Sequence, residues 1–242
     1  MTLPFEIMLV LGIVGFYLFD SAMLLYANEL IFAEKNGKWV FGRPESGWQM
    51  LGKNLYMPNP LTPDYPLFRA CWVVASASNE RQEDIEALRQ FLNVLNPLRY
   101  MTFGLFALLL IWLPIVLLGF GTGLGLLLLL GVIYCTITVM LAQIYRQREE
   151  LGLSGKTFAK LAFDSLACAP FALNLVRKIT LNRSLVGDPI CFAHQVLDAD
   201  AFAQLVQALC HRVDEEIEFE DEASPRCGAL KDFRNRIASM AS

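Results

Sequence analysis

The chain has 242 residues, of which 55% are hydrophobic and only 18% are charged, and its formal net charge is −4. A soluble domain typically carries about a quarter charged residues, so this composition favours an integral membrane protein. The charge balance shows no basic block of the kind that binds nucleic acid. Six scattered cysteines without a CxxC pair argue against a disulfide framework.

The chain begins with an apolar run over residues 5–27, and we assign residues 1–32 to a first transmembrane helix and its cytoplasmic extension. No basic segment precedes the run and no small-residue cleavage site follows it. The run is therefore expected to be a retained span and not a signal peptide.

Asp20 interrupts this first span, and an ionised carboxylate near the bilayer centre costs about 2.5–3.5 kcal/mol. On a helix it would share a polar stripe with Tyr17, Ser21 and Asn28, and Glu29 follows. The functional interpretations are an ion or proton path, or a site that pairs with a partner helix. In the structural interpretation, a span over residues 2–19 puts Asp20 at the membrane interface, where it costs little.

Residues 33–99 are expected to form a cytoplasmic loop rich in aromatic residues and proline, followed by a helix over 79–95 that breaks or kinks at Asn96-Pro97. The loop is expected to be extended, with little secondary structure, and to lie on the membrane face or a partner. Several of its polar residues could hold a lipid headgroup or an acidic partner, or simply anchor the loop at the interface. They are Arg43, Lys53, Asn54, Asp64 and Arg69.

Residues 100–145 contain no Asp, Glu, Lys or Arg, which is long enough for two crossings of about 20 residues each. The glycine-rich segment between the two apolar runs predicts a sharp turn. Pro114 is expected to kink the first of the two spans. The region therefore predicts a transmembrane hairpin.

Residues 146–242 are expected to form a cytoplasmic C-terminal region with amphipathic helices and an acidic linker. Residues 157–176 are expected to lie in the membrane plane, to dock on the spans, or to re-enter the bilayer with a break at Pro170. Arg177, Lys178 and Arg183 would then lie near anionic headgroups. A helix from about Asp198 buries one apolar face, an acid-rich solvated linker follows it, and a short apolar stripe lies near the end of the chain. These two apolar sets are Phe202, Leu205, Leu209 and Val213, and then Leu230, Phe233 and Ile237.

Lysine and arginine are absent from residues 1–32 and 100–145, whereas eight fall in residues 33–99 and twelve follow residue 145. The positive-inside rule then places both basic regions in the cytoplasm. We expect a multi-pass protein of the cytoplasmic (inner) membrane, with its N-terminus outside and its C-terminus in the cytoplasm.

The sequence contains no catalytic, phosphate-binding or dinucleotide-binding motif. The histidines, His194 and His211, lie near Cys191 and Cys210 in a spacing that matches no zinc pattern. We expect no metal and no cofactor.

Taken together, the patterns predict an all-α integral membrane protein with three transmembrane helices. They favour a non-catalytic membrane subunit, adaptor or assembly factor, with membrane lipids and other membrane protein subunits as partners and no nucleic acid. The alternatives are a transport or ion-coupling component that uses Asp20, and a lipid-handling membrane enzyme that uses residues 43–69.

Overall fold

The computed structural model describes residues 4–26, 28–35, 37–42, 49–50, 53–74, 83–119, 123–185, 187–221 and 224–240. The chain divides into two compact units, each made of separate stretches of sequence. Unit 1 comprises Met1–Met23, Met57–Pro66 and Ile85–Arg183, and unit 2 comprises Leu24–Tyr56, Leu67–Asp84 and Ser184–Ser242.

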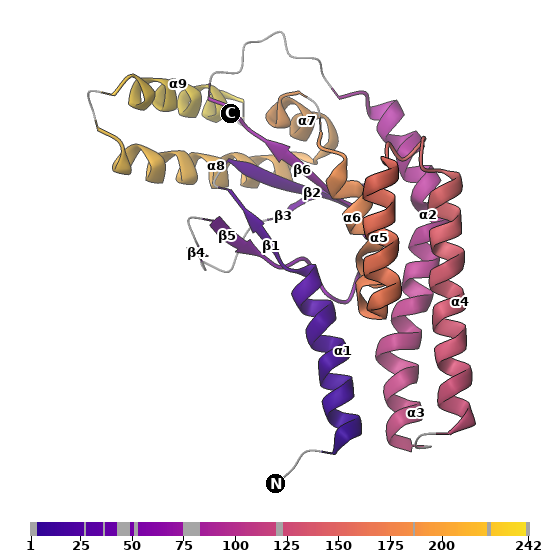
Figure 1. Ribbon diagram of the computed structural model, residues 1–242. Helices are drawn as coiled ribbons and strands as arrows, with labels where there is room; N and C mark the ends of the chain where they lie inside the picture. Colours follow the sequence, from indigo (N-terminus) through magenta and orange to yellow (C-terminus); the bar gives the residue numbers. More distant parts are fainter. Residues whose placement is uncertain are drawn as a thin grey trace. The chain divides into compact units, whose positions relative to one another are not determined.

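The main feature of unit 1 is a helical hairpin (Figure 1). Its first arm runs through α2 (Ile85–Ala107), the π-helix η1 (Leu108–Trp112) and α3 (Leu113–Gly119), and its second arm is α4 (Leu124–Arg146). Each arm reaches a mean hydropathy of 2.5, yet only 28% and 22% of their most apolar stretches are buried. Both helices are long and apolar enough to cross a membrane, as the charge-free segment predicted.

Two prolines lie within the first arm, and their effects differ. A break or a kink was predicted at Asn96-Pro97, and helix α2 continues through Pro97, so the helix does not break there. Pro114 follows the π-helix, and the carbonyl that its ring would crowd is that of Leu110, inside the widened turn. The wider π-turn relieves the clash between the proline ring and this carbonyl, and π-turns are a recognised cause of helix bending.

Helix α1 (Phe5–Ser21) is shorter than the predicted first span. The helix stops because Ala22 adopts an extended backbone with ψ of 137°, and strand β1 (Met23–Leu25) begins at the next residue. With 17 residues, α1 falls short of the roughly 20 that a crossing needs. The prediction of three transmembrane helices is therefore wrong.

The segment after the hairpin folds back onto unit 1. It comprises α5 (Gly155–Ala167), the 3-10 helix η2 (Ala169–Asn174) and α6 (Leu175–Asn182). The chain breaks at Cys168, just before Pro170, and η2 contacts α1, α2, α4 and α5. Of the expected arrangements, docking on the helices is the one that these contacts match.

Unit 2 contains strands, which corrects the all-α prediction. In its larger sheet, β2 (Glu29–Lys35) pairs antiparallel with β3 (Lys38–Gly42) and with β6 (Leu67–Cys71). A smaller sheet has the order β1, β5 (Lys53–Tyr56) and β4 (Gln49–Met50). The segment expected to be an extended loop with little secondary structure thus supplies strands, because its aromatic and apolar residues find partners across the sheet.

Three helices complete unit 2, and aromatic rings form much of its core. They are α7 (Pro189–Val196), α8 (Ala199–Phe219) and α9 (Pro225–Ser239). The ring of Phe192 packs edge-on against Phe32 and Trp39, each at 5.3 Å between centroids, and Trp72 stacks on Phe233 at 5.1 Å. These contacts tie α7 and α9 to the strands.

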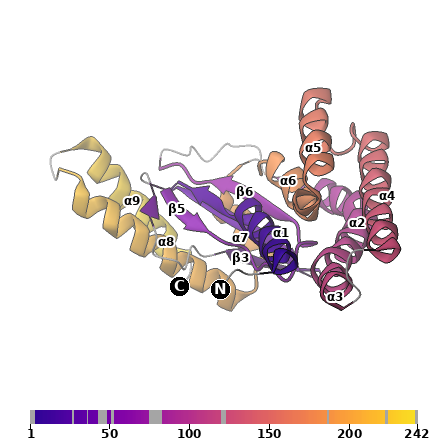
Figure 2. The same cartoon turned by 60° about the horizontal axis from the view of Figure 1, so that its bottom comes forward.

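Helices α8 and α9 lie side by side (Figures 1 and 2). The two predicted apolar sets are buried on these helices, which confirms both predictions. The acid-rich segment over residues 214–222 was expected to be a solvated linker, but α8 continues into it as far as Phe219. Its charges pair with α9: Asp214 lies 2.6 Å from Arg234, and Arg226 lies 3.1 Å from Glu220.

Candidate functional site

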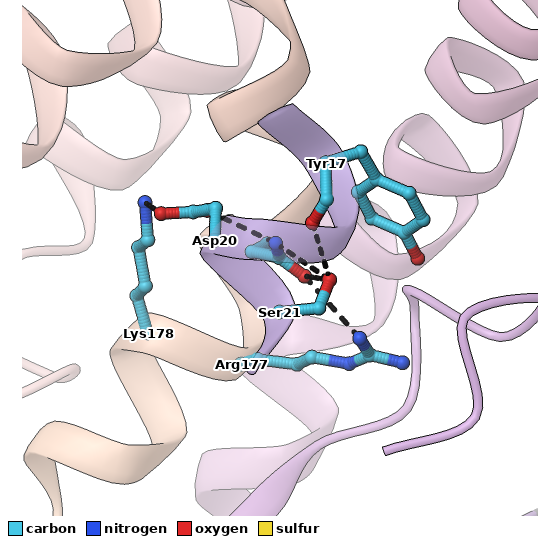
Figure 3. Close-up of polar contacts among 6 residues, drawn as sticks. Tyr17, Asp20, Ser21, Arg177 and Lys178 are labelled. Atoms are coloured by element: carbon cyan, nitrogen blue, oxygen red, sulfur yellow. Dashed lines mark hydrogen bonds and ion pairs between the residues drawn. The ribbon is translucent and has the colours of Figure 1, made fainter. Parts of the chain in front are cut away.

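A cluster of polar side chains joins the end of α1 to η2 and α6 inside unit 1 (Figure 3). Tyr17 and Ser21 lie four residues apart and therefore share one face of α1. From η2 and α6 the cluster receives Asn174, Arg177 and Lys178, which helical spacing places on neighbouring faces. We call these residues, together with Asp20, the α1–α6 cluster.

The Asp20 carboxylate uses both of its oxygens. One lies 2.8 Å from the ammonium group of Lys178, and the other accepts a hydrogen bond of 2.9 Å from the side-chain amide of Asn174. The side chains of Asp20 and Lys178 are 15% and 23% exposed. Because this pair is partly buried, water and salt screen the attraction between its two charges less than at a fully hydrated surface.

Asn174 lies at the centre of the α1–α6 cluster and is buried. The Ser21 hydroxyl lies 3.0 Å from the amide nitrogen of Asn174 and 3.2 Å from its amide oxygen, and it also donates to the Tyr17 carbonyl at 2.8 Å. Arg177 donates to the same amide oxygen at 3.3 Å. One amide therefore links the carboxylate of Asp20 to the guanidinium of Arg177.

Arg177 is only 3% exposed and fixes the loop over residues 57–66. One of its terminal nitrogens donates to the backbone carbonyls of Asn59 and Thr62, both at 2.7 Å. The Tyr17 hydroxyl donates to the carbonyl between them, that of Pro60, at 2.5 Å. A buried guanidinium needs such acceptors, because removing it from water without them is costly.

This geometry defines what the α1–α6 cluster does chemically. Both carboxylate oxygens of Asp20 and the amide of Asn174 are engaged inside the cluster. No nucleophile is paired with a base here, and the described residues contain no group of three or more His, Cys, Asp or Glu positioned to hold a metal ion. The hydrogen bonds and the ion pair of the cluster fix the positions of α1, the loop over 57–66 and α6 relative to one another.

The first predicted set of site residues is only partly brought together. Tyr17, Asp20 and Ser21 meet in the α1–α6 cluster of unit 1, whereas Asn28 and Glu29 belong to unit 2. The predicted polar stripe does not extend to them, because the chain leaves the helix after Ser21. The Asn28 amide instead donates to the carbonyl of Trp72 at 3.5 Å.

Glu29 begins strand β2 and is buried. Its carboxylate accepts from the backbone N–H of Tyr26 at 2.9 Å and lies 3.4 Å from Arg69. The Cys71 thiol donates to it at 4.0 Å. Cys71 is exposed as a residue, but partial desolvation of its sulfur raises the pKa of the thiol. The Glu29 carboxylate raises this pKa further, since a thiolate there would face a like charge.

The second predicted set, assigned to a headgroup or partner site, is dispersed. Lys53 and Asn54 lie on β5, where the Lys53 ammonium is 4.2 Å from the centroid of the Tyr26 ring, and Arg69 lies on β6. Asp64 belongs to unit 1. Arg43 lies outside the described residues.

The residues missed by the sequence patterns are those of η2 and α6. Arg177 and Lys178 were expected near lipid headgroups, yet Arg177 is buried and Lys178 pairs with Asp20. A buried arginine must have acceptors, but those of Arg177 are backbone carbonyls more than 100 residues away in the chain. Arg183 lies with its guanidinium 4.6 Å from the centroid of the Phe91 ring. Only the presence of cations in an apolar segment signals this site.

Comparison with known protein families, curated proteins and solved structures finds no match to this chain.

Proposed function

We propose that this protein is a non-catalytic membrane subunit, adaptor or assembly factor. The α2–α4 hairpin holds it in the bilayer, and unit 2 contacts a partner protein. In this proposal the α1–α6 cluster is a structural lock that fixes unit 1. The support comes from the surface of the hairpin, from the closed cluster and from one exposed aromatic residue of unit 2.

Two tyrosines and a neighbouring arginine, at the end of the hairpin away from the turn between its arms, support insertion of the hairpin. Tyr100 and Tyr145 are 80% and 55% exposed and flank the charge-free segment. The guanidinium of Arg148 lies 5.3 Å from the centroid of the Tyr145 ring. From Tyr100 to Gly119 the helical rise amounts to about 28 Å, close to the thickness of the hydrocarbon core. Aromatic rings beside cations are typical of the headgroup level.

The basic residues at the end of the hairpin away from the turn also support one orientation of the hairpin in the membrane. Arg99, Arg146 and Arg148 lie there, whereas the segment between the two arms carries none. Under the positive-inside rule we propose that this end and the C-terminus face the cytoplasm, in an inner membrane. The expected outside location of the N-terminus rested on a third span, which α1 does not provide.

Phe219 carries the proposal of a partner. It lies at the C-terminal end of α8 with 91% of its surface exposed, between Glu218 and Glu220. A ring with so much of its surface exposed buries little apolar area within its own unit. Aromatic anchors that become buried on binding dominate the energetics of protein interfaces. Glu220 is already paired with Arg226, so it is Glu218 that favours a partner with a basic group beside an apolar pocket.

A photo-crosslinking amino acid at position 219 tests this proposal in intact cells. The matched control places the same probe at Asn235, which is exposed on α9 of the same unit. We expect a discrete adduct of one additional protein from position 219 and not from 235, and a weaker complex when Phe219→Ala is purified in mild detergent. A clean monomer with no adduct at 219 would overturn the proposal.

The two alternatives draw less support from the geometry. Ion coupling through Asp20 requires its carboxylate to exchange partners, and both oxygens are already engaged with Lys178 and Asn174. A lipid-handling site within residues 43–69 requires its cations to converge, and among the described residues they lie on separate strands.

A further inference from the structure

Unit 1 contains an apolar groove along the seam between α1 and the hairpin. Its volume is about 320 Å³. It is lined by residues of α1, of the hairpin and of the start of η2, and Glu6 is the only charged residue among them. We call it the α1 groove.

The α1 groove has a buried floor and an open mouth. Leu109, Leu113 and Ile133 on the floor are almost completely buried, and Pro170 belongs to η2. At the mouth, Phe5 is 72% exposed and Leu130 is 39% exposed. The groove therefore opens onto the apolar outer surface of the hairpin.

We propose that the α1 groove binds one acyl chain of a phospholipid whose headgroup carries an amine, with Glu6 pairing with the ammonium. This inference rests on the proposed insertion of the hairpin, because the mouth then faces the hydrocarbon layer and lipid is what reaches it. The site gives the membrane-facing side of unit 1 a specific lipid ligand.

The dimensions favour a lipid tail over a helix of a partner protein. Helix α1 contacts η1 and α3 directly, so the space between them is a narrow seam. A helix with its side chains is about 10 Å across and cannot enter such a seam. A chain of methylene groups, with carbon–carbon contacts of about 4 Å, is narrow enough.

The charge at the rim selects the headgroup. Glu6 lies in the first turn of α1, and no hydrogen bond or ion pair to it occurs within the described part of the chain. A headgroup with only a phosphate would meet a like charge, whereas an ammonium group gains a favourable partner. No lysine or arginine lines the groove to attract a purely anionic lipid.

Native mass spectrometry of the full chain tests this, after purification in mild detergent and addition of phosphatidylethanolamine or phosphatidylglycerol. We expect the wild type to retain one phosphatidylethanolamine. Leu130→Trp, which fills the mouth, should reduce retention about tenfold, the loss expected when roughly two methylene groups are no longer buried. The control Leu118→Trp alters a residue that is 60% exposed on α3 outside the groove, and should retain lipid normally.

Glu6→Gln separates the tail from the headgroup. This variant should still hold a lipid but lose its preference for phosphatidylethanolamine over phosphatidylglycerol, whereas Glu149→Gln, at an exposed position after α4, should keep it. Equal retention by Leu130→Trp and Leu118→Trp, a wild type without lipid, or an unchanged preference in Glu6→Gln would overturn the proposal. Insertion of the hairpin is scored separately by the accessibility of Cys135 in intact membranes, so failed insertion is distinguished from failed lipid binding.

Discussion

Asp20 and Lys178 form an ion pair of 2.8 Å that joins the last turn of α1 to α6 across more than 150 residues of sequence. The apolar segment around Asp20 gives no sign of this partner. The aspartate that stands out in the first apolar run therefore finds its counter-charge inside its own unit, and this pairing determines how its substitution should behave.

Asp20→Asn should lower the free energy of unfolding by about 2 kcal/mol, since it removes a partly buried charge pair and leaves Lys178 without its carboxylate. The control Glu149→Gln removes a pair of 3.9 Å whose acid is 91% exposed, and should cost less than about 0.5 kcal/mol. Thermal unfolding in detergent measures both. Equal stability of Asp20→Asn and the wild type would contradict the structural lock, and loss of function without loss of stability would favour ion coupling.

Arg177→Met should release the loop over residues 57–66, because the carbonyls of Asn59 and Thr62 lose their shared donor. The unsatisfied carbonyls and lost hydrogen bonds should cost about 3 kcal/mol. Limited chymotrypsin digestion at Leu61, which is 69% exposed, should become faster. Arg89→Ala, at a side chain that is 70% exposed, serves as the control and should leave the cleavage rate unchanged.

Phe233→Leu should weaken unit 2, because it removes a ring stacked on Trp72 at an interplanar angle of 14°. We expect a loss of about 1–2 kcal/mol and reduced hydrogen-exchange protection in β6 and α9. Phe219→Leu, at an exposed position, should change neither. Unaltered protection after Phe233→Leu would show that this stack is not part of the core.

Glu29→Gln should accelerate alkylation of Cys71. Burial and then the Glu29 carboxylate raise the pKa of this thiol, so removal of the negative charge lowers the pKa and increases the thiolate fraction at pH 8. The rate with iodoacetamide, normalised to the unfolded chain, measures the effect. A slower or unchanged rate would mean that Glu29 does not act on the thiol.

The sequence predicted those features that a local pattern encodes. The absence of charge over residues 100–145 predicted the hairpin, and the spacing of Phe202 to Val213 predicted the buried face of α8. A segment suited to a membrane must be apolar along its length, and a helix packed on a core must repeat apolar residues along one face, so both features can be read from neighbouring residues.

The strands were missed for a physical reason. Most of β2 is buried, so its residues do not alternate between apolar and polar and they read as a continuation of the preceding apolar helix. The α1–α6 cluster was missed because its partners meet only in the tertiary fold. Ser21 and Asn174, for example, are separated by 153 residues.

Labelling of native cysteines in intact membranes tests the central claim, that the α2–α4 hairpin lies in lipid. Cys135 on α4 and Cys71 on β6 are both exposed on the protein surface. The raised pKa of Cys71 slows its own labelling, so faster labelling of Cys71 than of Cys135 indicates a bilayer around Cys135. With the other cysteines replaced by serine, we predict that a membrane-impermeant maleimide labels Cys71 in inside-out vesicles but labels Cys135 only after solubilisation in SDS. Labelling of Cys135 in intact vesicles at a rate equal to that of Cys71 would contradict membrane insertion and the functional account built on it.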